Sequence, residues 1–190
     1  METFIAVLVG LGLAAAAGFR VFVPLLAVGL AARFTDLPLT DGFAWMGSTA
    51  ALLTFGGATV VEVLAYYVPW IDNLLDTVAT PAAVVAGAVL TAAVVTDVDP
   101  VLRWSLAIVA GGGTATIFQG MTAGTRGIST LATGGVGNFL VATVEWVLSA
   151  VLSVLAVVVP IVAILVVVLL LAWAAQRATR RRPASASRYG

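Results

Sequence analysis

Apolar stretches of membrane-spanning length, separated by short polar segments, dominate the pattern of this chain. Hydrophobic residues make up 62% of the 190 positions and charged residues only 9%, whereas soluble domains carry about 25% charged residues. A helix needs roughly 20 apolar residues to cross a bilayer. The pattern therefore predicts an all-α polytopic membrane protein with five apolar stretches, at residues 3–32, 48–68, 81–96, 101–122 and 139–176.

Two of these stretches are too long for a single straight span. Residues 3–32 would reach about 45 Å as one helix and residues 139–176 about 57 Å, against a hydrocarbon core of about 30 Å. Gly18 and Pro24 predict a break or a fold-back in the first stretch. Pro160 predicts that the last stretch divides into two helices, and one long kinked helix is the alternative. The expected total is about six transmembrane helices.

Polar and glycine-rich segments indicate where the predicted helices end. Residues 33–47 form a polar linker. Thr80 followed by Pro81 is typical of a helix start, which places the beginning of the third span at Pro81. Residues 123–138 are rich in glycine, threonine and serine. We therefore expect no helix of span length there, and instead a broken helix or a re-entrant loop.

Short motifs recur in the two halves of the chain in the same order. Ala17–Arg20 reads Ala-Gly-Phe-Arg, and Ala123–Arg126 reads Ala-Gly-Thr-Arg. The segment that ends at Glu62 is repeated by the segment that ends at Glu145, with one residue deleted. Three crossings per half would make the two halves antiparallel in the membrane, which is an inverted-topology repeat.

The repeat and the arginine-rich end divide the chain into three parts. We expect the first membrane repeat at residues 1–98, the second at 99–176, and a disordered basic tail at 177–190. Arginines cluster in that tail, and cytoplasmic segments are enriched in basic residues. The C-terminus is therefore expected on the cytoplasmic side, and six spans place the N-terminus there as well.

The charges inside the apolar stretches are the candidate functional residues. A cation at bilayer depth costs roughly 2.5–3.5 kcal/mol on insertion scales, so such a residue usually faces a protein interior or a cavity. Arg20 and Arg126 are candidates to bind an anion, because the planar guanidinium matches phosphate or carboxylate oxygens. Glu62 and Glu145 would hold the arginines or carry protons. The alternative is that these four charges form structural ion pairs only.

Smaller residues near the arginines complete the predicted site. The hydroxyls of Thr125 and Ser129 would add hydrogen bonds to a bound anion. A broken backbone at membrane depth is tolerated where it is buried or lines a cavity. The predicted hinge residues of these breaks are Gly18, Pro24, Gly124 and Gly127.

Composition excludes several classes of function. The chain has no cysteine or histidine, which removes disulfides and the usual zinc and haem ligands, and we expect neither a metal nor a cofactor. It has no lysine either, so Ser129 lacks a partner for nucleophilic catalysis and we do not expect an enzyme. The formal net charge is zero, so overall charge predicts no nucleic-acid partner.

Two motifs resemble a known family. Residues 18–26, Gly-Phe-Arg-Val-Phe-Val-Pro-Leu-Leu, and residues 71–83, Ile-Asp-Asn-Leu-Leu-Asp-Thr-Val-Ala-Thr-Pro-Ala-Ala, are similar to the domain-of-unknown-function family 4126. With the segment around Arg126, the resemblance covers most of residues 3–175. It implies a small prokaryotic protein of the cytoplasmic membrane and implies no activity.

A second likeness concerns the segment around Arg126. Residues 122–129, Thr-Ala-Gly-Thr-Arg-Gly-Ile-Ser, are similar to the Pro-Gly-Thr-Ser-Arg-Ser loop of undecaprenyl-pyrophosphate phosphatase-type proteins. That likeness implies a re-entrant arginine loop that meets a lipid phosphate. Ala123 replaces the proline, and the catalytic Glu-xxx-Glu pair is absent, so the likeness implies phosphate handling without hydrolysis.

These observations lead to one main hypothesis and two alternatives. The main hypothesis is a small transporter or flippase for an anionic substrate, which could be a small anion or the phosphate headgroup of a membrane lipid. The first alternative is an ion channel or a proton-coupled cation transporter that uses Glu62 and Glu145. The second is a non-transporting membrane scaffold. Glycine-rich helix faces also allow a homodimer.

Overall fold

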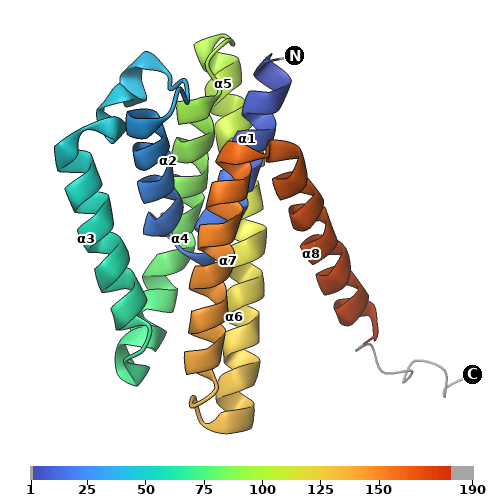
Figure 1. Ribbon diagram of the computed structural model, residues 1–190. Coiled ribbons are helices and arrows are strands. Elements are labelled where there is room, and N and C mark those ends of the chain that lie inside the picture. Colours follow the sequence, from blue (N-terminus) through green and yellow to red (C-terminus); the bar gives the residue numbers. More distant parts are fainter. Residues whose placement is uncertain (1, 181–190) are drawn as a thin grey trace, which may run out of the picture.

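Every regular element that the structure describes is a helix. The computed structural model describes residues 2–180, without the side chains of residues 69–74, 76 and 178–180. Figure 1 shows the helices arranged as one bundle from which the last helix diverges. The elements are α1 (Glu2–Phe19), α2 (Phe22–Phe34), the 3-10 helix η1 (Asp41–Gly47), α3 (Thr49–Ala65), α4 (Pro69–Val94), α5 (Pro100–Leu106), the π-helix η2 (Ala107–Gly112), α6 (Gly113–Thr133), α7 (Asn138–Val158) and α8 (Pro160–Arg180).

Helix α1 forms the centre of the bundle and packs against α4, α6, α7 and α8. Its residues Ala14–Ala17 are completely buried, and its glycines bring the neighbouring helices close. A Cβ added at Gly12 would lie 2.8 Å from the Cβ of Ala156, and one added at Gly18 would lie 2.5 Å from the Cβ of Phe118. Small residues allow this packing in lipid, where close contact between helices replaces the hydrophobic effect.

The helices confirm the predicted class of an all-α polytopic membrane protein. Within the described residues, five helical segments are long and apolar enough to cross a bilayer, and the count rises to six if η1 and α3, bent by 66°, form one span. The shorter α2 is also apolar. The five segments are Glu2–Phe19, Thr77–Val94, Pro100–Thr133, Asn138–Val158 and Pro160–Arg177.

Two predicted interruptions are present in the structure. Helix α1 ends at Phe19 and α2 begins at Phe22, so the backbone breaks at Arg20 and Val21. Helix α8 begins at Pro160, which takes the position where a missing N–H is tolerated. Figure 1 shows that α8 runs back in the opposite direction from α7, so the last stretch is two helices and not one kinked helix.

The prediction that residues 123–138 contain no helix of span length was wrong. Helix α6 continues through this segment to Thr133, and the chain turns only at Gly134 and Gly135, which both have positive φ. In lipid the backbone must satisfy its own hydrogen bonds, so a helix persists through residues that would favour a loop in water. The Thr125 hydroxyl supports it by donating to the carbonyl of Met121 at 2.8 Å.

Two other predicted boundaries also need correction. The third span was expected to start at Pro81, but α4 starts at Pro69 and contains Pro81 in its interior. Pro69 already occupies the first turn, where proline fits best. Of the predicted tail at residues 177–190, residues 177–180 continue α8 and residues 181–190 lie outside the described part. The inverted repeat stays a prediction, and its shared motif lies at a helix break in one half but inside a helix in the other.

Candidate functional site

Arg20 lies at the break between α1 and α2, in the interior of the bundle. Its residue surface is only 2% exposed. Its Nη2 lies 3.0 Å from Oε2 of Glu145 and donates to the carbonyl of Ala142 at 3.3 Å. Its Nε and Nη1 are buried and have no hydrogen-bond partner among the residues that the structure describes. Arg20 therefore keeps two donors available to a further acceptor.

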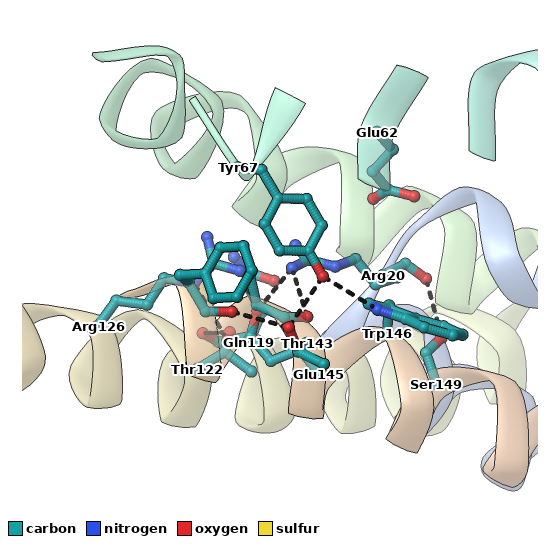
Figure 2. A network of polar contacts seen from close by, with 12 residues as sticks. Arg20, Glu62, Tyr67, Gln119, Thr122, Arg126, Thr143, Glu145, Trp146 and Ser149 are labelled. Carbon is teal, nitrogen blue, oxygen red and sulfur yellow. Dashed lines mark hydrogen bonds and ion pairs between the residues drawn. The ribbon is translucent and has the colours of Figure 1, made fainter. Parts of the chain in front are cut away.

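Arg126, in the second half of the chain, contacts the same Glu145 carboxylate. It projects from α6, is 3% exposed, and donates from Nε to Oε1 of Glu145 at 3.1 Å. Its Nη2 also contacts Oε2 of Glu145. Figure 2 shows both arginines converging on Glu145, which projects from α7. The two predicted anion-binding arginines thus share one acidic partner; Arg20, Arg126 and Glu145 are called the arginine cluster below.

The ring of Tyr66 covers both guanidinium groups. The guanidinium carbon lies 3.7 Å from the ring centroid for Arg20 and 4.0 Å for Arg126. An aromatic face attracts cations, and the attraction is stronger where water is excluded. Tyr66 is itself buried and follows α3 directly as its C-cap residue. This helix therefore brings an aromatic cover to the arginine cluster.

Glu62 has a different role from Glu145. Its two carboxylate oxygens accept hydrogen bonds from the backbone N–H groups of Val21 at 2.8 Å and Phe22 at 3.0 Å. The N-terminus of α2 has no side-chain cap of its own, and helix N-termini carry a partial positive charge. The prediction that both glutamates would hold the arginines is therefore met by Glu145, whereas Glu62 caps the broken helix.

The smaller predicted residues are distributed unevenly around the cluster. Gly18 lies in the last turn of α1, where it packs closely against α6. Pro24 lies in the first turn of α2, so the two residues flank the break. Gly124 and Gly127 lie within the unbroken α6, and the predicted hinge there is absent.

The two hydroxyl residues predicted to bind the anion, Thr125 and Ser129, both lie on α6. Thr125 lines a cavity described below. Ser129 lies nearer the turn between α6 and α7, where a Cβ added at Gly137 would come within 2.5 Å of its hydroxyl.

Buried polar residues surround the cluster, and two of them, Gln119 and Ser149, were missed in the sequence. Gln119 and Thr122 lie on the same face of α6 as Arg126, at a spacing of three, four and seven residues, and all three are buried. Ser149 lies one helical turn from Glu145 and donates to the carbonyl of Ala16 at 2.9 Å. The spacing of Gln119 from Arg126 would have identified it if the predicted helix had continued past residue 122, and the spacing of Ser149 from Glu145 was available within the predicted stretch 139–176.

A second set of contacts ties the α3–α4 corner to α7. The hydroxyls of Tyr67 and Thr143 lie 2.9 Å apart, and Nε1 of Trp146 donates to the Tyr67 hydroxyl at 3.3 Å. The Tyr67 ring also packs against Phe139, with ring centroids 4.7 Å apart. These contacts of Tyr67 with Thr143 and Trp146, drawn in Figure 2, fix the segment next to Tyr66, whose ring covers the arginines.

Two cavities adjoin the cluster. The larger, of about 860 Å³, lies between α6, α7 and α8, and Glu145 forms part of its wall. The smaller, of about 200 Å³, lies beside Glu62 and Tyr66 between α2, α3 and α4. The larger cavity is lined by Phe19, Met121, Thr122, Thr125, Leu140, Val141, Val144, Glu145, Leu148, Val166, Leu169, Leu170, Ala172, Trp173 and Gln176.

The chemistry of the site is that of charge recognition. In the described part of the chain, no group of three acidic side chains is placed to hold a metal ion. The arginine cluster offers planar hydrogen-bond donors in a setting from which water is largely excluded, where charged hydrogen bonds are strongest. The oxyanion that this arrangement holds in the structure is the carboxylate of Glu145.

Comparison with known proteins assigns a family. Among curated proteins and solved structures, none matches the chain. A family match extends over residues 7–181, which includes every residue of the arginine cluster and Tyr66. The chain therefore belongs to the family described as Domain of unknown function (DUF4126).

Proposed function

We propose that this protein is a small membrane transporter or flippase that binds an anionic substrate at Arg20 and Arg126. The observation that carries the proposal is the state of Arg20, whose Nε and Nη1 are buried without a hydrogen-bond partner among the described residues. A buried donor without a partner costs about 1–3 kcal/mol, and more when the group is charged. An incoming oxyanion would supply an acceptor to one of these donors, on the edge that it shares with Nη2.

The carboxylate of Glu145, which both arginines now bind, indicates which substrates would fit. Glu145 offers a planar oxyanion to both guanidinium groups, with its Oε2 3.0 Å from Nη2 of Arg20. A substrate carboxylate or phosphate has the same oxygens at similar spacing. We propose that the substrate competes with Glu145 for the arginines, so that binding and release involve an exchange of one anion for another.

The alternative of a cation pathway through the two glutamates receives less support from the geometry. Glu62 is engaged by two backbone N–H groups and Glu145 by two arginines. A cation would have to replace those partners at both positions. The proposed function includes no covalent step, and the protein is proposed to act by binding and conformational change.

The membrane orientation is part of the proposal. The end of α8 carries Arg177, whose guanidinium lies 4.6 Å from the ring of Trp173, and further arginines follow at 180–182. Trp and Arg commonly meet at the membrane–water interface. We place this end on the cytoplasmic side.

The test uses purified protein in proteoliposomes, with uptake of radiolabelled phosphate and scrambling of a fluorescent phosphatidylglycerol as the two readouts. The variants are Arg20→Lys, Arg126→Lys and Arg20→Ala, and Arg33→Ala is the matched control because Arg33 is exposed at the end of α2. Lysine keeps the charge but loses the planar fork. We expect each cluster variant to lose activity by at least tenfold in one readout. Activity equal to that of Arg33→Ala in every cluster variant that elutes as a folded protein would refute the proposal.

A further inference from the structure

We infer that the larger cavity receives the acyl chain of an anionic lipid whose headgroup reaches the arginine cluster. This inference rests on the proposed function and narrows its substrate class from any anion to an anionic amphiphile. The cavity, its lining, and its connection to Glu145 each support it. We call this cavity the α6–α8 groove.

The lining of the groove suits a hydrocarbon chain. Large apolar side chains point into it although nothing in the described chain covers them, and Val144, Leu169 and Trp173 are 56%, 67% and 54% exposed. Figure 1 shows α8 running away from α6 and α7 towards its C-terminal end, and the residues that line the groove come mainly from these three helices. The volume of about 860 Å³ lies within the 300–1,000 Å³ range, roughly, of cavities that hold discrete ligands.

The medium around the groove is lipid. Helices α7 and α8 and the run that includes α6 are each long and apolar enough to span a bilayer. Acyl chains are therefore the molecules present at highest concentration at the mouth of the groove. An apolar channel alone would accept any lipid, so the selectivity must come from its polar residues.

The polar residues of the groove connect the lipid chain to charge recognition. Apart from Thr122, Thr125 and Gln176, the polar part of the wall is Glu145, and the same carboxylate holds both arginines. Neither arginine lines the groove itself, so a headgroup reaches the guanidinium groups by displacing Glu145, which stands between them. The groove and the arginine cluster therefore form one site with an apolar part and a cationic part.

A basic residue also stands at the wider end of the groove. Trp173 and Gln176 line that end, and the guanidinium of Arg177 lies against the Trp173 ring. A basic residue near a membrane surface attracts anionic lipids. Arg177 at this end, and the two arginines behind Glu145, therefore favour an anionic lipid over a zwitterionic one.

The test fills the groove and measures the lipid that stays bound. Val144→Trp on α7 and Leu169→Trp on α8 place a bulky ring in the lining. Their controls are Val151→Trp and Val168→Trp, which are 49% and 54% exposed on the same helices but do not line the groove. Each protein is reconstituted in vesicles of equal phosphatidylglycerol and phosphatidylcholine, extracted in mild detergent, and examined by native mass spectrometry.

We expect the unaltered protein and both controls to retain phosphatidylglycerol at least tenfold over phosphatidylcholine, and both groove variants to lose that retained lipid. Equal retention of the two lipids, or unchanged retention in whichever groove variant folds, would overturn the inference. If retention is unchanged while Arg20→Lys still abolishes phosphate uptake, the groove inference fails and the proposed function stands. If Arg20→Lys changes neither retention nor uptake, both fail.

Discussion

The replacement Glu145→Gln tests both the stability of the arginine cluster and the exchange of anions at it. Glu145 accepts from Nε of Arg126 at 3.1 Å and contacts Nη2 of both arginines. Removing one partner of a buried ion pair costs about 3–5 kcal/mol. Glutamine keeps one acceptor oxygen, so we expect a loss near the lower limit, about 3 kcal/mol, which corresponds to a fall in Tm of roughly 6–12 °C for a chain of this length.

An added anion should reverse much of this loss. The neutral glutamine amide holds the guanidinium groups more weakly than the carboxylate does, so phosphate can displace it more readily. A ligand present at 100 times its Kd stabilises the folded state by about 2.7 kcal/mol. The variant should therefore regain nearly all of its stability in saturating phosphate, whereas the unaltered protein should gain much less.

The absence of cysteine from the sequence makes the measurement direct. One reporter thiol, Val28→Cys, lies at a completely buried position of α2, and its reaction with a thiol-activated dye on heating reports unfolding in detergent. Glu2→Gln, at the exposed start of α1, is the matched control for loss of a carboxylate. A Tm equal to that of Glu2→Gln would show that the shared carboxylate does not hold the cluster. A lowered Tm that phosphate leaves unchanged would rule out anion exchange.

Three further variants, with Gly120→Ala as a control for the first, can be measured with the same thiol reporter. Gly18→Ala should cost about 1–3 kcal/mol by overpacking α1 against α6, whereas Gly120→Ala, which has open space around it, should be neutral or more stable by up to about 1 kcal/mol; equal effects would contradict the close packing. Tyr67→Phe should cost about 1 kcal/mol through its lost contact with Thr143, and no loss would show that the corner is held by ring packing alone. Glu62→Ala should cost about 2–4 kcal/mol, because two N–H groups at the start of α2 lose their acceptors; a Tm that does not change would contradict its capping role.

The features that could be predicted from the sequence are those imposed by the membrane itself. Apolar length identifies the spans, and proline identifies the start of α8 at Pro160. A charge in an apolar stretch has to be placed in the protein interior, which is why Arg20, Arg126 and Glu145 could be singled out and why all three are buried. Each of these arguments needs only local sequence and the cost of charge in lipid.

The features that were missed depend on how the helices meet. A loop was expected around Arg126 because Gly, Thr and Ser favour loops in water, but lipid enforces the helix α6. Glu62 could not be distinguished from Glu145 by residue type, because its partner is the free N-terminus of another helix. Tyr66 resembled an ordinary interfacial aromatic residue, and only the packing of α3 places it on the arginines.

The spacing of Glu62 and Tyr66 has a mechanical consequence for α3. The two residues are four positions apart, so one face of this helix holds both the start of α2 and the guanidinium groups. Few other side chains of α3 are buried, so the remaining resistance to a roll of the helix about its axis comes mainly from these and from the contacts of Tyr67 with α7. Such a roll would release the amides of Val21 and Phe22 and uncover Arg20 in a single motion. Deuterium uptake at those amides and phenylglyoxal modification of Arg20 should then rise with one shared time constant.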